Sequence, residues 1–170
     1  MIGNSIPFLA IKPARILPRI SSSAKMSLID SSTTLKVSST LDKSVGKKNL
    51  IDGSPETCWT SAAGLPQSIE LVFSDTVTPK QLALTFQGGF VGTRCTVYGI
   101  LAGGGEDAGS LKWQAIAQIY PEDINRRQTF DLTPSTNEID LSKGVSRLKV
   151  VFEESSDFFG RITLYNLELF

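Results

Sequence analysis

The chain has 170 residues and a mass of 18.4 kDa, which is the size of one ordinary domain with a short tail rather than of two domains. Hydrophobic residues make up 41% of it, enough to bury a core, which excludes a wholly disordered chain. Histidine is absent, and this removes His-ligated zinc, the commonest general base and every nucleophile pair that uses a histidine. The composition therefore favours a protein that is not an enzyme.

The balanced charge of 17 basic and 17 acidic residues conceals an asymmetry. The first 29 residues carry four basic groups and no acidic one, so the rest of the chain holds 13 basic and 17 acidic residues, a net charge of −4. Such an acidic body lacks the concentrated basic face that direct nucleic-acid binding requires. No stretch is apolar over the roughly 18 residues that a membrane-spanning helix needs. We therefore expect neither nucleic acid nor a membrane as a direct partner.

Residues 1–28 indicate an appendage rather than part of the fold. Prolines recur at intervals too short for a continuous helix. The basic, serine-containing and acid-free composition is similar to that of a mitochondrial transit peptide, but a disordered extension ahead of an alternative start at Met26 fits the same residues. We therefore expect a basic disordered extension or a targeting segment over residues 1–28 and a folded domain over residues 34–170.

Eight short runs in the body alternate apolar and polar residues, and turn-forming residues separate them. Period-two runs rich in β-branched and aromatic residues predict half-buried strands. The predicted strands cover residues 34–40, 68–73, 80–86, 94–101, 112–120, 127–132, 146–152 and 161–170. One helical turn is expected at 46–52, and the Gly-rich run at 103–105 predicts a hairpin loop. Because no long amphipathic helix accompanies the strands, the pattern predicts an all-β sandwich or jelly roll.

The most informative stretch runs from Asp52 to Ser61 and reads DGSPETCWTS. Aspartate and glycine favour a tight turn, and Trp59 enters the next extended segment, where we expect it to anchor the core rather than stack on a sugar. This stretch, together with a last strand like Leu164–Leu169, resembles the discoidin, or galactose-binding-like, superfamily. The resemblance covers residues 34–170 and implies a galactose-binding-like (discoidin-type) jelly-roll β-sandwich.

Several motifs in the same order carry a closer resemblance. They are GKKNLID and ETCW within 46–59, FQGGF at 86–90, YPED and QTF within 120–130, and RLKVVFEESSDFFGRI at 147–162. Together they resemble the orphan-nuclear-receptor-associated proteins, described as repressors of testicular receptor 4. The resemblance implies a protein of the nucleus and cytoplasm that binds the receptor and suppresses its DNA binding. The mitochondrion is the alternative location if residues 1–25 are a transit peptide.

The superfamily resemblance also implies a structural calcium ion. In many members the turn that corresponds to DGSPET holds calcium through an aspartate, a threonine, backbone carbonyls and a glutamate of the last strand, which here are Asp52, Thr57 and Glu168. Calcium takes six to eight oxygen ligands, and such a turn supplies several of them. The alternative is that Asp52 only caps the turn and that Glu168 is solvated. No other cofactor is expected.

Two segments carry aromatic residues, glycines and charges that sandwich packing does not demand, and we assign them to partner binding. The first is the loop from Gln87 to Arg94, in which Phe90 would be a desolvated anchor and Arg94 a directional charge. The second is the loop that contains Asp157 and Phe158. The alternative is that Phe90 folds back over the edge of the sandwich.

Three further features have structural interpretations. The adjacent phenylalanines at 158–159 would, in a strand, point to opposite faces, one into the core and one outward. The Lys47-Lys48 pair is typical of a solvated surface. Cys58 and Cys95 fit two reduced thiols, or else a single bridge.

A protein-interaction module that acts as a transcriptional co-regulator is the leading hypothesis for the function. A carbohydrate- or head-group-binding module is one alternative, and an adaptor subunit of a larger complex is another. The fold cannot decide among them, because one sandwich hosts many functions.

Overall fold

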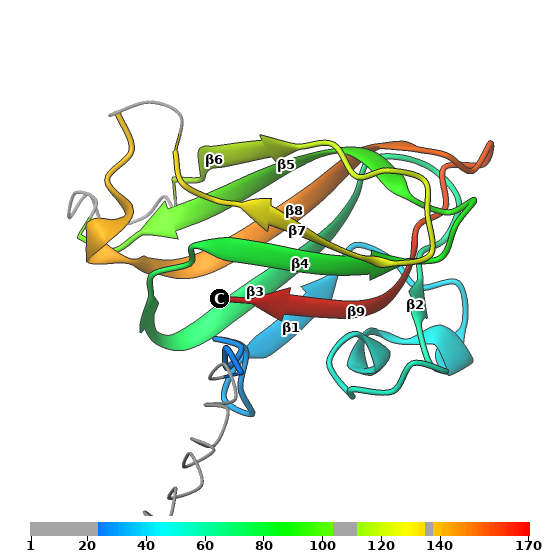
Figure 1. Ribbon diagram of the computed structural model, residues 1–170, viewed down its shortest axis with the longest axis horizontal. Coiled ribbons are helices and arrows are strands. Elements are labelled where there is room, and N and C mark those ends of the chain that lie inside the picture. The colour runs from blue at the N-terminus through cyan, green and yellow to red at the C-terminus, as the bar shows by residue number, and fades with distance from the viewer. Residues whose placement is uncertain (1–23, 104–111, 135–137) are drawn as a thin grey trace, which may run out of the picture.

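The structure, a computed structural model, describes residues 24–103, 112–134 and 138–170. Two antiparallel β-sheets face one another, and three short 3₁₀ helices complete the described part (Figure 1). The strands are β1 (Thr34–Val37), β2 (Trp59–Thr60), β3 (Gln67–Val77), β4 (Gln81–Phe86), β5 (Gly92–Leu101), β6 (Gln114–Ile119), β7 (Arg127–Asp131), β8 (Val145–Ser155) and β9 (Thr163–Leu169). The 3₁₀ helices are η1 (Lys43–Val45), η2 (Lys47–Leu50) and η3 (Leu141–Lys143). This architecture confirms the predicted all-β sandwich.

One sheet has the order β1-β3-β8-β5-β6 and the other the order β2-β9-β4-β7. All eight runs of alternating residues overlap a strand, and the helical turn expected at 46–52 is η2. Strand β2 has only two residues, which is too short to leave a periodic pattern in the sequence. The loop predicted at 103–105 falls mostly on residues outside the described part. Among the described residues, no helix has both the length and the apolar character to cross a membrane.

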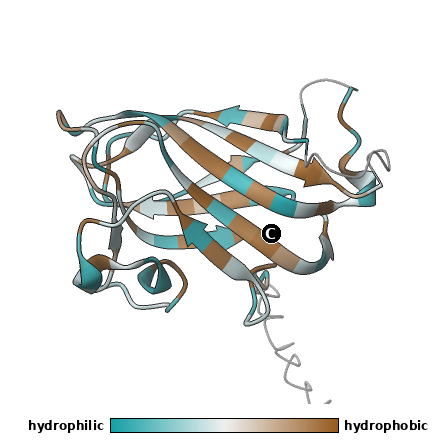
Figure 2. Cartoon of the chain, turned by 180° about the vertical axis from the view of Figure 1, so that it is seen from behind, coloured by the Kyte–Doolittle hydropathy of each residue, from teal (hydrophilic) through white to brown (hydrophobic). Residues whose placement is uncertain are grey.

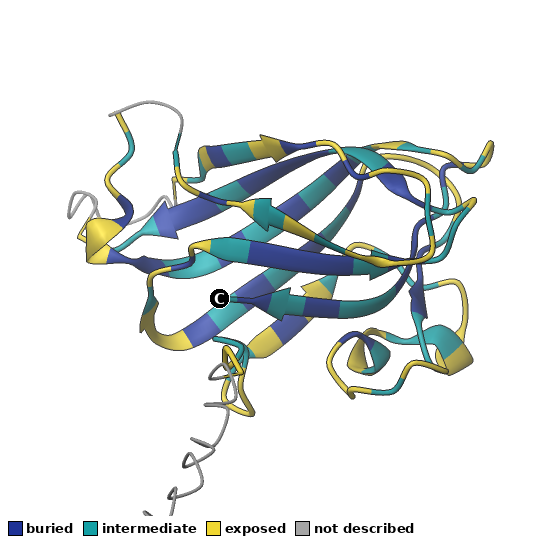
Figure 3. Cartoon of the chain, in the orientation of Figure 1, coloured by how far each residue is buried: buried dark blue, intermediate teal, exposed yellow. Residues whose placement is uncertain are grey.

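The core lies between the two sheets, because each strand turns its apolar residues inward. Figure 2 shows the alternation of hydrophilic and hydrophobic positions along the strands, and Figure 3 shows the matching alternation of buried and exposed positions. Trp59 is 0% exposed, and its Nε1 donates to the Ser39 carbonyl over 3.0 Å. Its ring lies 6.2 Å from that of Phe152, which in turn meets the Phe86 ring edge-on at 6.1 Å. The expectation that Trp59 anchors the core is confirmed.

Strand direction gathers three loops at one end of the sandwich. The antiparallel pairing places the end of β4, the start of β5, the end of β8 and the start of β9 side by side. The β4–β5, β6–β7 and β8–β9 connections therefore all lie at the right-hand end in Figure 1. The chain ends at the opposite end, where β9 finishes beside the start of β4. We call the end of the sandwich that carries the three connections the loop end.

The described residues that precede β1 contact the sandwich. The Leu28 amide donates to the Leu169 carbonyl over 2.6 Å, and the Leu169 amide donates to Ser27 Oγ over 3.3 Å. Lys25 Nζ donates to Gln81 Oε1 over 2.7 Å, and Leu28 packs against the core together with Ile29. Among the described residues, contact with the sandwich is therefore present from Lys25 onward, within the segment 1–28 that the sequence indicates as an appendage. Residues 1–23 lie outside the described part.

Candidate functional site at the loop end

The β8–β9 turn is closed by an ion pair between Asp157 and Arg161. Arg161 Nε donates to Asp157 Oδ2 over 2.9 Å, and Arg161 Nη2 donates to Asp157 Oδ1 over 3.0 Å. The same carboxylate accepts the Arg161 backbone amide at 3.0 Å. A two-pronged guanidinium–carboxylate pair of this kind fixes the orientation of both groups. These hydrogen bonds lower the pKa of Asp157, and the carboxylate raises the pKa of Arg161.

The Arg161 guanidinium also lies close to two aromatic rings. It is 5.0 Å from the centroid of the Phe90 ring and 5.5 Å from that of Phe159, within the range of cation–π attraction. Phe158 meets Phe159 edge-on at 5.3 Å. Phe158 is 93% exposed and Phe159 61% exposed, and Leu65 of the β2–β3 connection is 41% exposed beside this turn. We call the surface formed by Leu65, Phe158 and Phe159 the aromatic tip.

The turn that carries the aromatic tip is held rigidly by its backbone. Gly160 adopts a φ of +74°, a conformation that residues with a side chain rarely adopt. The Gly64 amide donates to the Phe159 carbonyl over 2.8 Å, which ties the turn to the β2–β3 connection. An open hollow of about 550 Å³ lies along this junction. The exposed rings therefore stand on a fixed support.

The β4–β5 loop is fixed in the same way by its neighbours. The Gly88 amide donates to Asn125 Oδ1, and the Gly89 amide donates to Asp123 Oδ1 over 2.7 Å, so the β6–β7 connection holds both glycines. The Gln87 amide donates to the Thr163 carbonyl over 3.0 Å. The backbone amides of this loop thus bond to a β9 carbonyl and to two side chains of the β6–β7 connection.

The structure brings together most, but not all, of the residues predicted to bind a partner. Phe90 and Asp157 both contact Arg161, and Phe158 lies on the same turn. Phe90 is half-buried, as expected of a ring that folds back against the sandwich. Gln87 lies on the adjoining loop, where its Oε1 accepts from the Tyr165 hydroxyl at 3.4 Å.

Arg94 does not belong to this cluster. It lies within β5, where its Nε is 3.0 Å from Glu153 Oε2 and its Nη1 is 3.1 Å from Glu154 Oε1 on the neighbouring β8. Its charge is therefore paired inside its own sheet. The expectation that Arg94 belongs to the loop is wrong, because β5 begins at Gly92 rather than after Arg94.

The expectation that one phenylalanine of the 158–159 pair enters the core is also wrong. Strand β8 ends at Ser155, so both rings belong to a turn and the alternation of a strand does not apply to them. Sequence reasoning also missed Arg161 and Phe159 as members of the site. The spacing of Asp157 and Arg161, with a glycine just before the arginine, is the signal that could have revealed the closed turn.

The structure joins two of the three residues proposed as calcium ligands, Asp52 and Thr57, but Glu168 does not bond to either of them. Asp52 Oδ2 accepts from the Thr57 hydroxyl at 2.6 Å, and Asp52 Oδ1 accepts from the Ser54 amide at 2.9 Å. These bonds, the Thr57 bond above all, lower the pKa of Asp52. Glu168 is engaged elsewhere, since its Oε2 accepts from Arg127 Nε at 2.7 Å. The described residues include no group of three acidic, histidine or cysteine side chains able to hold a metal. The calcium prediction is therefore not supported, and Asp52 acts as the cap of its turn.

Both cysteines are free, which confirms the interpretation as two reduced thiols over that of a single bridge. Cys58 is half-buried and Cys95 is buried in β5. Burial, reinforced by the charge of Glu153, raises the pKa of the Cys95 thiol far above its ordinary value. A protonated, enclosed thiol is a packing group rather than a nucleophile.

Replacing Asp157 with asparagine is expected to lower the melting temperature at neutral pH, because Arg161 then loses its charged acceptor. The pKa of Asp157 is lower in the folded state, so the stability it provides is present above its unfolded pKa and is lost as the pH falls through the folded one. We therefore expect the difference between wild type and Asp157→Asn to shrink below a pH of about 4. Melting curves of both proteins from neutral to acidic pH test this. A difference that stays constant with pH would contradict it.

Solved structures share this fold at low sequence identity, and no protein-family profile matches the chain. The F5/8 type C domain of a Bacteroides fragilis protein superposes with a TM-score of 0.64 at 13% identity, covering 85% of this chain and 94% of that one. Chitosan-binding module 1 of a Paenibacillus chitosanase/glucanase gives 0.62 at 16% identity, covering 82% and 95%. The family 32 carbohydrate-binding module of Clostridium perfringens NanJ, solved with galactose, gives 0.59 at 17%, covering 82% and 93%. These likenesses confirm the galactose-binding-like fold.

Other relatives are much more similar in sequence, and the match extends over nearly the whole length of each. The nuclear receptor 2C2-associated proteins of Bos taurus and Homo sapiens are each 39% identical to this chain over 146 residues, and that of Danio rerio is 40% identical. In each case the match spans 84% of this chain and 94% of the relative. Identity at this level over a complete domain confirms the resemblance that the ordered motifs indicate. The chain belongs to the family of nuclear receptor 2C2-associated proteins.

Proposed function

We propose that this protein is a non-enzymatic interaction module that binds a nuclear receptor and suppresses its DNA binding, as a transcriptional co-regulator in the nucleus and cytoplasm. The main support is a set of relatives whose names state association with nuclear receptor 2C2. Each is 39–40% identical to this chain, and the match covers 94% of its length. In an organism that lacks this receptor, we expect an equivalent protein to be the partner.

The aromatic tip is the surface that we assign to the receptor. Exposed aromatic rings on a rigid support, with an arginine beside them, are the residue types that dominate interface energetics. Because the turn and its neighbours are already fixed by hydrogen bonds, little conformational entropy is lost when a partner binds.

The charge of the body favours a masking mechanism over competition for DNA. From residue 30 onward the chain carries a net charge of −4, which repels phosphates at long range. An acidic body docked beside the DNA-binding face of a receptor would oppose the approach of DNA without contacting it.

A competition measurement tests this proposal. The purified protein is titrated into a complex of nuclear receptor 2C2 with fluorescently labelled response-element DNA, and anisotropy reports the bound DNA. We expect the DNA to be released as the protein binds the receptor. A stable ternary complex would contradict suppression of DNA binding while leaving association intact, and no binding at all would contradict both. A reporter fused to residues 1–25 separates nuclear and cytoplasmic from mitochondrial location.

Substituting Phe158 with alanine is expected to weaken receptor binding by about 1–2 kcal/mol without changing the melting temperature. The ring is 93% exposed, so its removal costs the fold almost nothing, while a partner would lose a large apolar contact. Calorimetric titration and melting curves of the same preparation measure the two effects. Leu41→Ala is the matched control, because Leu41 is also exposed (50%) but lies outside the aromatic tip. Equal affinities for Phe158→Ala and wild type would remove this turn from the interface.

Carbohydrate binding is the second candidate, and one hollow favours it. A recess of about 440 Å³ on the sheet that contains β4 and β9 is lined by Thr85, Asn125, Tyr165 and Asn166, with the turn at 53–55 as its rim. Amide and hydroxyl groups beside an aromatic ring are suited to a sugar. Galactose titrated against the labelled protein should perturb the side-chain amides of Asn125 and Asn166 in an NMR spectrum. An unchanged spectrum at saturating galactose would exclude that sugar.

A further inference from the structure

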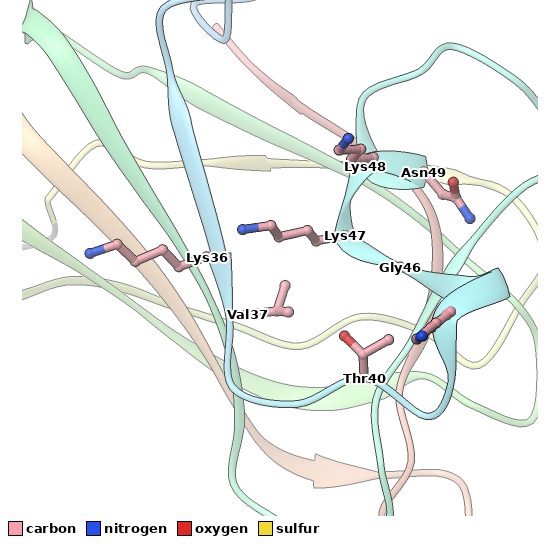
Figure 4. A pocket seen from close by; sticks show the side chains of 8 residues that line it. Lys36, Val37, Thr40, Gly46, Lys47, Lys48 and Asn49 are labelled. Carbon is pink, nitrogen blue, oxygen red and sulfur yellow. The ribbon is translucent and has the colours of Figure 1, made fainter.

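Four lysines line a single hollow at the edge of the sandwich. Lys36 comes from β1, Lys43 from η1, and Lys47 and Lys48 from η2. Together with Val37 and Thr40 they line a recess of about 690 Å³ (Figure 4). Lysines separated in the sequence are thus gathered on one concave surface, which we call the lysine hollow.

The walls of the lysine hollow belong to the folded frame. Strand β1 is the edge strand of its sheet, and the chain returns beside it through η1 and η2. Lys47 Nζ reaches across to the Leu35 carbonyl over 2.7 Å, joining η2 to that edge. Leu50, the last residue of η2, is fully buried in the core, and Asp42 caps η1 by accepting from the Ser44 amide at 2.7 Å. Both walls are therefore fixed before any ligand arrives.

The lysine hollow carries an excess of positive charge among the described residues. No residue that lines it is acidic, and none of the four lysines forms an ion pair with a described residue. The nearest acidic residues are Asp42, which precedes Lys43 and accepts from the Ser44 amide, and Glu70, which lies opposite Lys36 in the sheet and pairs with Arg147. Four like charges in a small recess repel one another, and an anion placed among them would relieve that repulsion. This concentration stands out on a body whose net charge is −4.

We propose that the lysine hollow docks an extended acidic segment of a protein partner. Its size suits a few residues of extended chain, and Val37 and Thr40 offer contacts to side-chain carbon atoms that a phosphate backbone lacks. The acidic remainder of the body disfavours a long polyanion, whereas a short segment meets only the lysines. The lysine hollow shares no residue with the aromatic tip, so this proposal stands or falls independently of receptor binding.

A fluorescein-labelled hexaglutamate peptide is the probe, and anisotropy is the readout on the full-length protein. We expect saturable binding at low ionic strength that is lost in about 1 M salt, where the Debye length falls to about 3 Å. The double variant Lys43→Glu/Lys48→Glu is expected to weaken binding on the order of tenfold or more, since two attractions become repulsions. Both side chains are exposed and form no hydrogen bond or ion pair with a described residue, so the melting temperature should not change.

Lys80→Glu/Lys143→Glu is the matched control, because it alters the net charge equally at two exposed lysines far from the lysine hollow in the fold. We expect it to retain most of the affinity. Equal loss in both double variants would overturn the proposal in favour of a general charge effect, and absence of binding to the wild type would also overturn it. A single-stranded oligothymidine that binds more tightly than hexaglutamate, with the same dependence on Lys43 and Lys48, would overturn it in favour of nucleic acid.

Discussion

Trp59→Ala is expected to lower the free energy of unfolding by about 3–5 kcal/mol, the usual cost of removing a fully buried large aromatic side chain. The substitution leaves a cavity beside Phe152 and also removes the donor to the Ser39 carbonyl. Domains of this size are stable by only about 5–15 kcal/mol, so the variant should be largely unfolded at modest temperature. Urea denaturation followed by far-ultraviolet circular dichroism measures the loss.

Trp59→Phe separates the two contributions. It keeps an aromatic ring in the core but leaves the Ser39 carbonyl without its indole donor, which should cost about 1–3 kcal/mol. The order of stability is therefore wild type, then Trp59→Phe, then Trp59→Ala. If Trp59→Ala unfolds within about 1 kcal/mol of the wild type, the residue is not the anchor that its burial indicates.

Gly160→Ala is expected to destabilise the fold by about 2–5 kcal/mol and to weaken receptor binding as well. The positive φ of this residue costs an L-amino acid about 1–2 kcal/mol. A β-carbon here would also lie 2.9 Å from Leu65 Cγ and 3.2 Å from the Gly64 carbonyl carbon, and relieving such overlap costs about 1–3 kcal/mol. Movement of the turn displaces Phe158 and Phe159 together. Urea denaturation and calorimetric titration of one preparation follow both effects.

Gly89→Ala is the control for backbone strain alone. Gly89 has a φ of +86°, but no atom lies within 4 Å of the position that a β-carbon would occupy. Its cost should therefore be only the strain of about 1–2 kcal/mol, with Phe158 and Phe159 left in place. Equal losses of stability in Gly89→Ala and Gly160→Ala would show that the contact with Leu65 and Gly64 carries no weight.

The strands could be predicted from the sequence because the physics that forms them is local and repetitive. Alternation at Ile69, Leu71 and Phe73 describes a surface with one buried face, and the structure buries all three residues. Trp59 followed from the same logic, since a large aromatic residue after a tight turn has no other place to be buried. The two-residue β2 has no period, so only its pairing with β9 defines it.

The site was predicted less well, because its geometry depends on where strands end. Two adjacent phenylalanines are compatible with a strand and with a turn, and only the end of β8 decides between them. Arg94 was assigned to a loop because the sequence does not show that β5 already begins at Gly92. The calcium site failed for a different reason. Asp52 and Thr57 form a hydrogen bond with one another. An aspartate and a threonine at this spacing therefore fit a turn closed by hydrogen bonds as well as a turn that binds a metal.

Pairs of charges in the sequence also conceal what the fold assembles. Lys47 and Lys48 alone indicate a solvated surface, and only the return of the chain past β1 adds Lys36 and Lys43 to them. Such convergence of residues from separate elements leaves no signal in a linear motif.

The contact between Leu28 and Leu169 has a consequence for how the domain sits in any larger assembly. The segment that leads into the sandwich at Leu28 lies beside the last strand, at the end of the sandwich opposite the loop end (Figure 1). A tag or tether attached after Phe170 would therefore leave from the end opposite the aromatic tip, with the loops exposed to solvent. The domain can therefore be immobilised on a surface through its C-terminus while the loop end stays accessible to a partner.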